Sequence, residues 1–215
     1  MTLPKYFSGS SKTDPKPVHH SATALLSALL SVAEHDIIPK MRQGVADGNQ
    51  AFAAAVLSQG DLAPVTVSVN KAVESPLLHG ETSCIRDFFA DPDHPPSREC
   101  IFLSTHEPCS LCLSGITWTG FQVVYFMFTY EDSRDLFGVG RDIDILEEVF
   151  RVKAPGDDEE SLKGRALYNK KNRFFAAKSM WELLDEVEGG EERKKWRTEV
   201  DRVRELYREF MISTP

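Results

Sequence analysis

The sequence reads HGE at positions 79–81 and STHEPCSLC at positions 104–112, and the predicted fold is organised around these two stretches. Ahead of the second one, the apolar run Ile101–Leu103 predicts a short buried strand. Pro108 suits the first position of a helix. The pattern over Glu81–Phe89 predicts a second helix. Both stretches are therefore expected at the N-terminal ends of helices.

Together the two stretches supply three residues of the kind that bind zinc. Cys109 and Cys112 lie at i and i+3 of the predicted helix, so both thiols fall on one face, and the positive end of that helix favours thiolates. His79 can complete a site with three protein ligands, which leaves the fourth tetrahedral position of a zinc ion for water. An open site of this kind is typical of a catalytic zinc.

Glu81, two residues after His79, is the predicted acid and base. A carboxylate there can accept a proton from water and pass it to a leaving amine. A CxxC pair alone more often indicates a structural zinc site, and an isolated HxE carries little information. Here HGE and the CxxC pair occur in this order, each after a predicted strand and at a helix start. Their combination favours the interpretation as a catalytic zinc site.

Further strands and helices surround these stretches. Ala22–Ala33 has helical apolar spacing, Phe52–Leu57 and Val65–Val69 predict a β-hairpin, and Val123–Phe128 predicts a strand covered on both faces. The alternation of strands and helices indicates a three-layer α/β or α+β domain over residues 21–150.

The two ends of the chain differ from this domain in composition. Residues 1–20 have no periodic apolar pattern and are predicted to form a mobile arm. Residues 151–215 are predicted to form a charged, mainly helical C-terminal extension that includes the basic segment 163–178. Its last helix, residues 191–211, has an apolar stripe that we expect to pack on the domain or on another subunit.

Composition restricts the classes of partner and compartment. The 215-residue chain has a formal net charge of −8, which disfavours general affinity for polyanions such as nucleic acids. It contains no membrane-spanning apolar run and no secretory-signal core. Cys84 and Cys100 are expected to be buried and not to bind metal. A small-molecule substrate and a reducing, cytoplasmic location are therefore predicted, with no membrane association.

HGE and EPCSLCL together resemble the cytidine deaminase-like superfamily, over about residues 21–150. The resemblance implies an α/β/α sandwich with a central mixed five-stranded sheet, and one zinc ion per chain held between two helix N-termini. It assigns the zinc to His79, Cys109 and Cys112 and proton transfer to Glu81. It also implies a homodimer or a larger assembly.

Within the superfamily, EPCSLCL and the following ITW look most like the branch of guanine, cytosine and tRNA adenosine deaminases. By this resemblance Asn70 and Glu107 contact the substrate, and Trp118 either lines its pocket or belongs to the core. Gly80 either leaves space for the substrate or allows close helix packing. This branch often closes its pocket with residues that follow the fourth core strand, here within 130–137.

Three functions are compatible with these features. The first is hydrolytic deamination of a nucleobase, nucleoside or related amino-heterocycle, and the net charge favours a guanine- or cytosine-type small substrate. The second is deamination of a nucleic acid such as tRNA, with segment 163–178 as a basic, aromatic surface. The third is a catalytically idle, zinc-stabilised binding module, against which the intact Glu81 argues.

Overall fold

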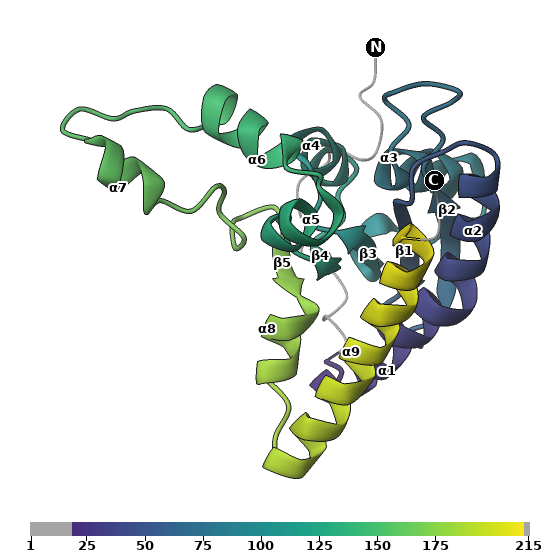
Figure 1. Cartoon of the computed structure of the whole chain (residues 1–215). Helices are drawn as coiled ribbons and strands as arrows, with labels where there is room; N and C mark the ends of the chain where they lie inside the picture. The colour runs from purple at the N-terminus through teal and green to yellow at the C-terminus, as the bar shows by residue number, and fades with distance from the viewer. Residues whose placement is uncertain (1–18, 213–215) are drawn as a thin grey trace, which may run out of the picture.

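The protein is built on one mixed β-sheet (Figure 1), and the computed structural model describes residues 19–212. The strands are β1 (Ala53–Ser58), β2 (Pro64–Val69), β3 (Cys100–His106), β4 (Val123–Phe128) and β5 (Ala176–Ser179). They lie in the order β2-β1-β3-β4-β5. β1 is antiparallel to β2 and β3, whereas β3, β4 and β5 are parallel. The predicted hairpin and the mixed five-stranded sheet are confirmed; residues 1–18 of the predicted arm lie outside the described residues.

Helices cover both faces of the sheet. The longer helices are α1 (Ala22–Val32), α2 (Ile38–Ala46), α3 (Gly80–Ala90), α4 (Ser110–Trp118), α5 (Tyr130–Phe137) and α9 (Gly190–Ile212). The shorter ones are α6 (Arg141–Ile145), α7 (Glu159–Lys163) and α8 (Met180–Asp185), with π-helical segments at Ala33–Ile37 and Leu146–Phe150 and a 3-10 turn at Ser97–Glu99. No helix in the described part of the chain is long and apolar enough to cross a membrane.

Alternate residues of the strands point to opposite faces, as the two-residue repeat of a strand requires. Ala53, Ala55 and Leu57 of β1 belong to the core formed with α1, α8 and α9. Ala54 and Val56 belong to a second core, formed with α3 and α4. The predicted three-layer α/β/α sandwich is therefore confirmed, and its two cores meet through the sheet.

The C-terminal extension is part of this sandwich. β5 lies beyond residue 150 and completes the sheet beside β4. The apolar stripe of α9 packs on its own domain: Val200, Val203 and Tyr207 are fully buried, and α9 runs along α1 (Figure 1). The Tyr207 hydroxyl donates a hydrogen bond to the carbonyl of Ala51. Residues 21–150 therefore do not form the sheet alone; α6 and α7, by contrast, project to one side (Figure 1).

Gly80 sets how closely α3 approaches β1. A methyl group at this position would lie 2.6 Å from Cα and 2.7 Å from the backbone nitrogen of Ala53. Real side chains do not come this close to a backbone, so only glycine permits the observed contact. Of the two roles considered for Gly80, the structure supports close helix packing.

We expect Gly80→Ala to lower the free energy of unfolding by about 1–3 kcal/mol, because the added methyl group overpacks the contact with Ala53. Denaturant unfolding of the metal-free protein measures this. Gly190→Ala is the matched control, since nothing lies within 4 Å of a methyl group there, and it should change the unfolding free energy by less than about 0.5 kcal/mol. Equally small effects for the two variants would contradict the close contact.

Candidate metal centre and substrate cavity

The N-terminal ends of α3 and α4 meet at one place. His79 and Cys109 are the residues immediately before these helices, and each has an extended backbone, with φ −61° and ψ 165° or 169°. Cys112 lies in the first turn of α4. The helix thus begins at Ser110, one residue beyond Cys109, and not at Pro108 as predicted, because Cys109 occupies the capping position.

His79, Cys109 and Cys112 form a compact donor set. Their ligand atoms all lie within 4.8 Å of one another. His79 Nδ1 is 3.5 Å from Cys109 Sγ and 3.6 Å from Cys112 Sγ. Hydrogen bonds with Cys112 and His79 lower the pKa of the Cys109 thiol well below its ordinary value. Two thiol sulfurs and one imidazole nitrogen at this spacing fit zinc, which binds both donor types tetrahedrally.

Glu81 lies beside these donors with only 6% of its surface exposed. The Ser104 hydroxyl on β3 donates to Glu81 Oε1 at 3.0 Å, and Cys112 Sγ is 3.4 Å from Oε2. Burial, with a further contribution from nearby Cys109, raises the pKa of Glu81 to about 7. A carboxyl group with a pKa near neutrality can both accept and release a proton.

A cavity of about 490 Å³ opens beside the donor set. This volume is in the range of small-molecule sites. It is lined by Gln50, Phe52, Asn70, Ala72, Pro76, His79, Glu81, His106, Glu107, Cys109, Ser110, Leu111, Val139, Arg141, Asp142 and Ile145. The cavity therefore brings together two of the three predicted metal ligands, His79 and Cys109, with Glu81 and two of the four predicted substrate contacts, Asn70 and Glu107.

Asn70 is buried at the end of β2. Its side-chain oxygen accepts a hydrogen bond from the backbone nitrogen of Ala72 at 2.9 Å, and its own backbone nitrogen donates to Phe52 O at 2.7 Å. These bonds fix the residue in the wall of the cavity. Its amide NH₂ group is the part available to donate to a ligand.

Gly80 and Trp118, the other two predicted substrate contacts, do not line the cavity. Gly80 faces the backbone of Ala53. Trp118 is the last residue of α4, and 67% of its surface is exposed. The helix starts at the metal centre and carries Trp118 away from it, so the expectation of a pocket-lining tryptophan is corrected.

Two charged cavity residues, Arg141 and Asp142, were missed by the sequence analysis. Burial raises the pKa of Asp142 to about 6, with a smaller contribution from Cys109. No motif marks these residues. Residues 130–137, which follow β4, were expected to close the pocket. They form α5, the helix that precedes α6.

His106 lines the same cavity as a neutral ring. It is buried, its ring stacks on Phe128 with centroids 5.1 Å apart, and Phe52 lies 4.5 Å away. Burial, aided by the charge of Arg204, lowers the pKa of His106 to about 3. His106 is not part of the donor set.

The basic segment 163–178 makes ionic contacts within the chain. Lys178 pairs with Glu186, and Arg165 pairs with Asp157 at 2.6 Å. Lys170 lies 3.6 Å from carboxylate oxygens of Glu107 and Glu182, and Arg173 covers the ring of Phe174. Part of the segment's positive charge, that of Arg165, Lys170 and Lys178, is therefore balanced within the chain.

Comparison with known proteins agrees with the geometry. Residues 32–128 match the family described as the cytidine and deoxycytidylate deaminase zinc-binding region. A solved structure of a mutant NE0047 protein in complex with 8-azaguanine is 16% identical, with a TM-score of 0.51 and 87% of each chain covered. No curated protein gave a match.

Two further solved structures are guanine deaminases. The one from Nitrosomonas europaea is 14% identical, with a TM-score of 0.47 and coverage of 93% of this chain and 89% of that chain. The one from Bacillus subtilis is 19% identical, with a TM-score of 0.46 and coverage of 73% and 99%. The family match over residues 32–128, the fold shared with the NE0047 structure and the His-Cys-Cys donor set together support placing this chain in the cytidine deaminase-like superfamily.

Proposed function

We propose that this protein is a zinc-dependent hydrolytic deaminase that acts on a nucleobase, nucleoside or related amino-heterocycle and releases ammonia. One observation carries the proposal: the buried carboxylate of Glu81 lines a ligand-sized cavity directly beside the His79, Cys109 and Cys112 donor set. A purely structural zinc site has no use for such a carboxylate. One zinc ion per chain is proposed at these three residues.

The arrangement gives Glu81 a defined task. A zinc ion at the donor set supplies Lewis acidity, which makes water a stronger acid and a better nucleophile. Ser104 holds Glu81 Oε1, so that Oε2 is directed toward Cys112 and the donor set. Glu81 takes a proton from the attacking water and delivers it to the leaving amine, while a carbon–oxygen bond forms and the carbon–nitrogen bond breaks.

The polar groups of the cavity support a planar, base-sized substrate. The Asn70 amide can donate to a ring carbonyl or ring nitrogen, and the Asp142 carboxylate can accept from an N–H group. An amino-substituted purine or pyrimidine presents both kinds of group on its edge. Guanine- and cytosine-type compounds are therefore the favoured substrates, in keeping with the 8-azaguanine bound in the NE0047 structure that shares this fold.

The two other functions are less well supported. A nucleic-acid deaminase would need the basic segment to be available, but Lys170, Lys178 and Arg165 form ion pairs within the chain. A catalytically idle module would not need Glu81 to be oriented by Ser104.

We also propose that the protein is a cytoplasmic homodimer. The free thiols of all four cysteines suit a reducing compartment. Phe150 and Val152, in the segment between α6 and α7, expose 56% and 75% of their surfaces. A dimer would give these apolar side chains a partner.

Glu81→Gln should reduce ammonia release by about 10²–10⁴-fold, because the amide cannot accept the proton, and should retain bound zinc. Ammonia release from bases, nucleosides, nucleotides, triazines and oligonucleotides, together with zinc content, tests this. Equal background ammonia release from wild type and Glu81→Gln on every compound would refute the proposed enzymatic activity. Activity confined to oligonucleotides would instead select the nucleic-acid alternative.

Asp142→Asn should lower kcat/KM on the preferred substrate by about 10–100-fold, since a charged hydrogen-bond acceptor is lost. Asp144→Asn is the matched control, because Asp144 is exposed on the same helix and does not line the cavity. Steady-state kinetics compare the two variants. Equal kcat/KM for both would remove Asp142 from substrate recognition.

A homodimer should sediment at about twice the chain mass of 24.2 kDa. Sedimentation velocity at micromolar concentration measures this directly. Phe150→Ser should shift the distribution toward monomer, because it removes an exposed apolar side chain. A wild-type protein that is entirely monomeric would refute the dimer.

A further inference from the structure

A short turn between β3 and α4 carries the metal-binding residue Cys109. It consists of Glu107, Pro108 and Cys109. The backbone nitrogen of Glu107 donates to Phe128 O at 2.7 Å, which continues the pairing of β3 with β4. At the other end, Cys109 O accepts the first hydrogen bond of α4, from the backbone nitrogen of Leu113 at 2.8 Å. The position of Cys109 Sγ therefore depends on how this turn is held.

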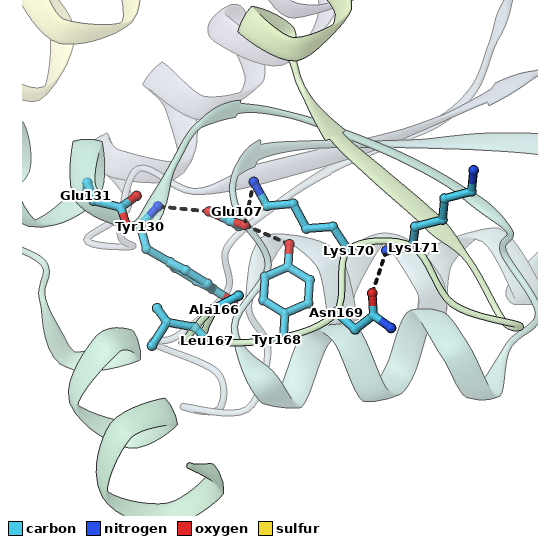
Figure 2. A pocket seen from close by; sticks show the side chains of 9 residues that line it. All are labelled: Glu107, Tyr130, Glu131, Ala166, Leu167, Tyr168, Asn169, Lys170 and Lys171. Atoms are coloured by element: carbon cyan, nitrogen blue, oxygen red, sulfur yellow. Dashed lines mark hydrogen bonds and ion pairs between the residues drawn. The ribbon is translucent and has the colours of Figure 1, made fainter. Parts of the chain in front are cut away.

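The Glu107 side chain is an anchor of the turn. Only 4% of Glu107 is exposed, and a carboxylate buried to this degree requires hydrogen-bond donors. Its Oε2 accepts from the backbone nitrogen of Tyr130 at 3.1 Å, and its Oε1 accepts from the Tyr168 hydroxyl at 2.7 Å (Figure 2). Lys170 Nζ lies 3.6 Å from the same Oε1.

A second tyrosine holds the next residue of the turn. The Tyr130 hydroxyl donates to Pro108 O at 2.5 Å. The rings of Tyr130 and Tyr168 meet edge to face, with centroids 6.1 Å apart. The two tyrosines therefore act on adjacent residues, Tyr130 on Pro108 and Tyr168 on Glu107, while Cys109 follows directly.

Tyr168 and Lys170 come from the C-terminal extension, in the segment between α7 and β5. They face a cavity of about 740 Å³ that is distinct from the substrate cavity but shares Glu107 with it. The polar groups in the middle of this second cavity, Glu107, Tyr168 and Lys170, bind one another (Figure 2). These contacts hold the turn in place and leave few polar groups in this second cavity to which a ligand could bind.

We propose that Tyr168 is a positioning residue of the metal centre: by its hydrogen bond to Glu107, and in concert with Tyr130, it fixes the turn that presents Cys109 to zinc. The inference rests on the zinc site of the proposed function and deepens it. It gives the C-terminal extension a task in the active site of its own chain. Residues that orient metal ligands from outside commonly change metal affinity when they are altered.

The test compares Tyr168→Phe with the full-length wild type. The phenylalanine keeps the ring and removes only the hydroxyl, and Tyr125→Phe on β4 is the matched control, a buried tyrosine that is not near the turn. Zn²⁺ dissociation constants are measured by competition with a chelator. Tyr168→Phe should weaken zinc binding about tenfold, whereas Tyr125→Phe should change it by less than about twofold.

Two further measurements separate positioning from general destabilisation. The visible absorption of bound Co²⁺ reports thiolate geometry and should change in Tyr168→Phe alone. In a Glu107→Ala background, where the hydroxyl has lost its acceptor, adding Tyr168→Phe should not weaken zinc binding further. Thermal unfolding of the metal-free proteins records any separate loss of stability.

A wild-type zinc affinity and Co²⁺ spectrum in Tyr168→Phe would overturn the inference, even if the variant were less stable. That result would leave the proposed deaminase intact. Conversely, a wild type that binds zinc and shows the Tyr168 effect, but releases no ammonia from any compound, would refute the proposed function and support the inference.

Discussion

The candidate site depends on the contact between Gly80 and the backbone of Ala53. It lets α3 lie against β1 at a distance that no side chain would allow. The residues on either side of Gly80 are His79 and Glu81, so the same contact fixes a proposed metal ligand and the proposed proton carrier. Glycine here serves the site through packing, because its missing side chain brings α3 close enough for His79 to meet the two cysteines.

The site also requires two carboxylates to be buried, and each is held differently. Glu81 has the Ser104 hydroxyl on one oxygen and a raised pKa, which suits a group that changes its protonation. Glu107 receives donors on both oxygens, from Tyr130 and Tyr168. A carboxylate bound on both sides is suited to fixing a backbone turn, whereas one with an oxygen directed at the donor set is suited to proton transfer.

The C-terminal extension contributes both to the sheet and to the candidate site. It supplies β5 to the sheet, covers one face with α9, and brings Tyr168 to Glu107. Three basic residues of segment 163–178, Arg165, Lys170 and Lys178, form ion pairs within the chain, so part of the positive charge of this segment is balanced internally. Charge sorting along a chain and charge on a folded surface are different properties, because ion pairs form between residues far apart in sequence.

Features with a local signature could be predicted from the sequence alone. The hairpin, the core strands and the helices at both motifs follow from apolar periodicity, and the zinc-binding residue types follow from fixed spacings such as that of Cys109 and Cys112. The placing of Asp142 in the cavity, of Trp118 outside it, of β5 in the sheet and of Tyr168 on Glu107 was decided only by tertiary structure. These contacts join segments that have no periodic relation to each other, and they form only when α6 reaches the cavity and β5 of the extension joins the sheet.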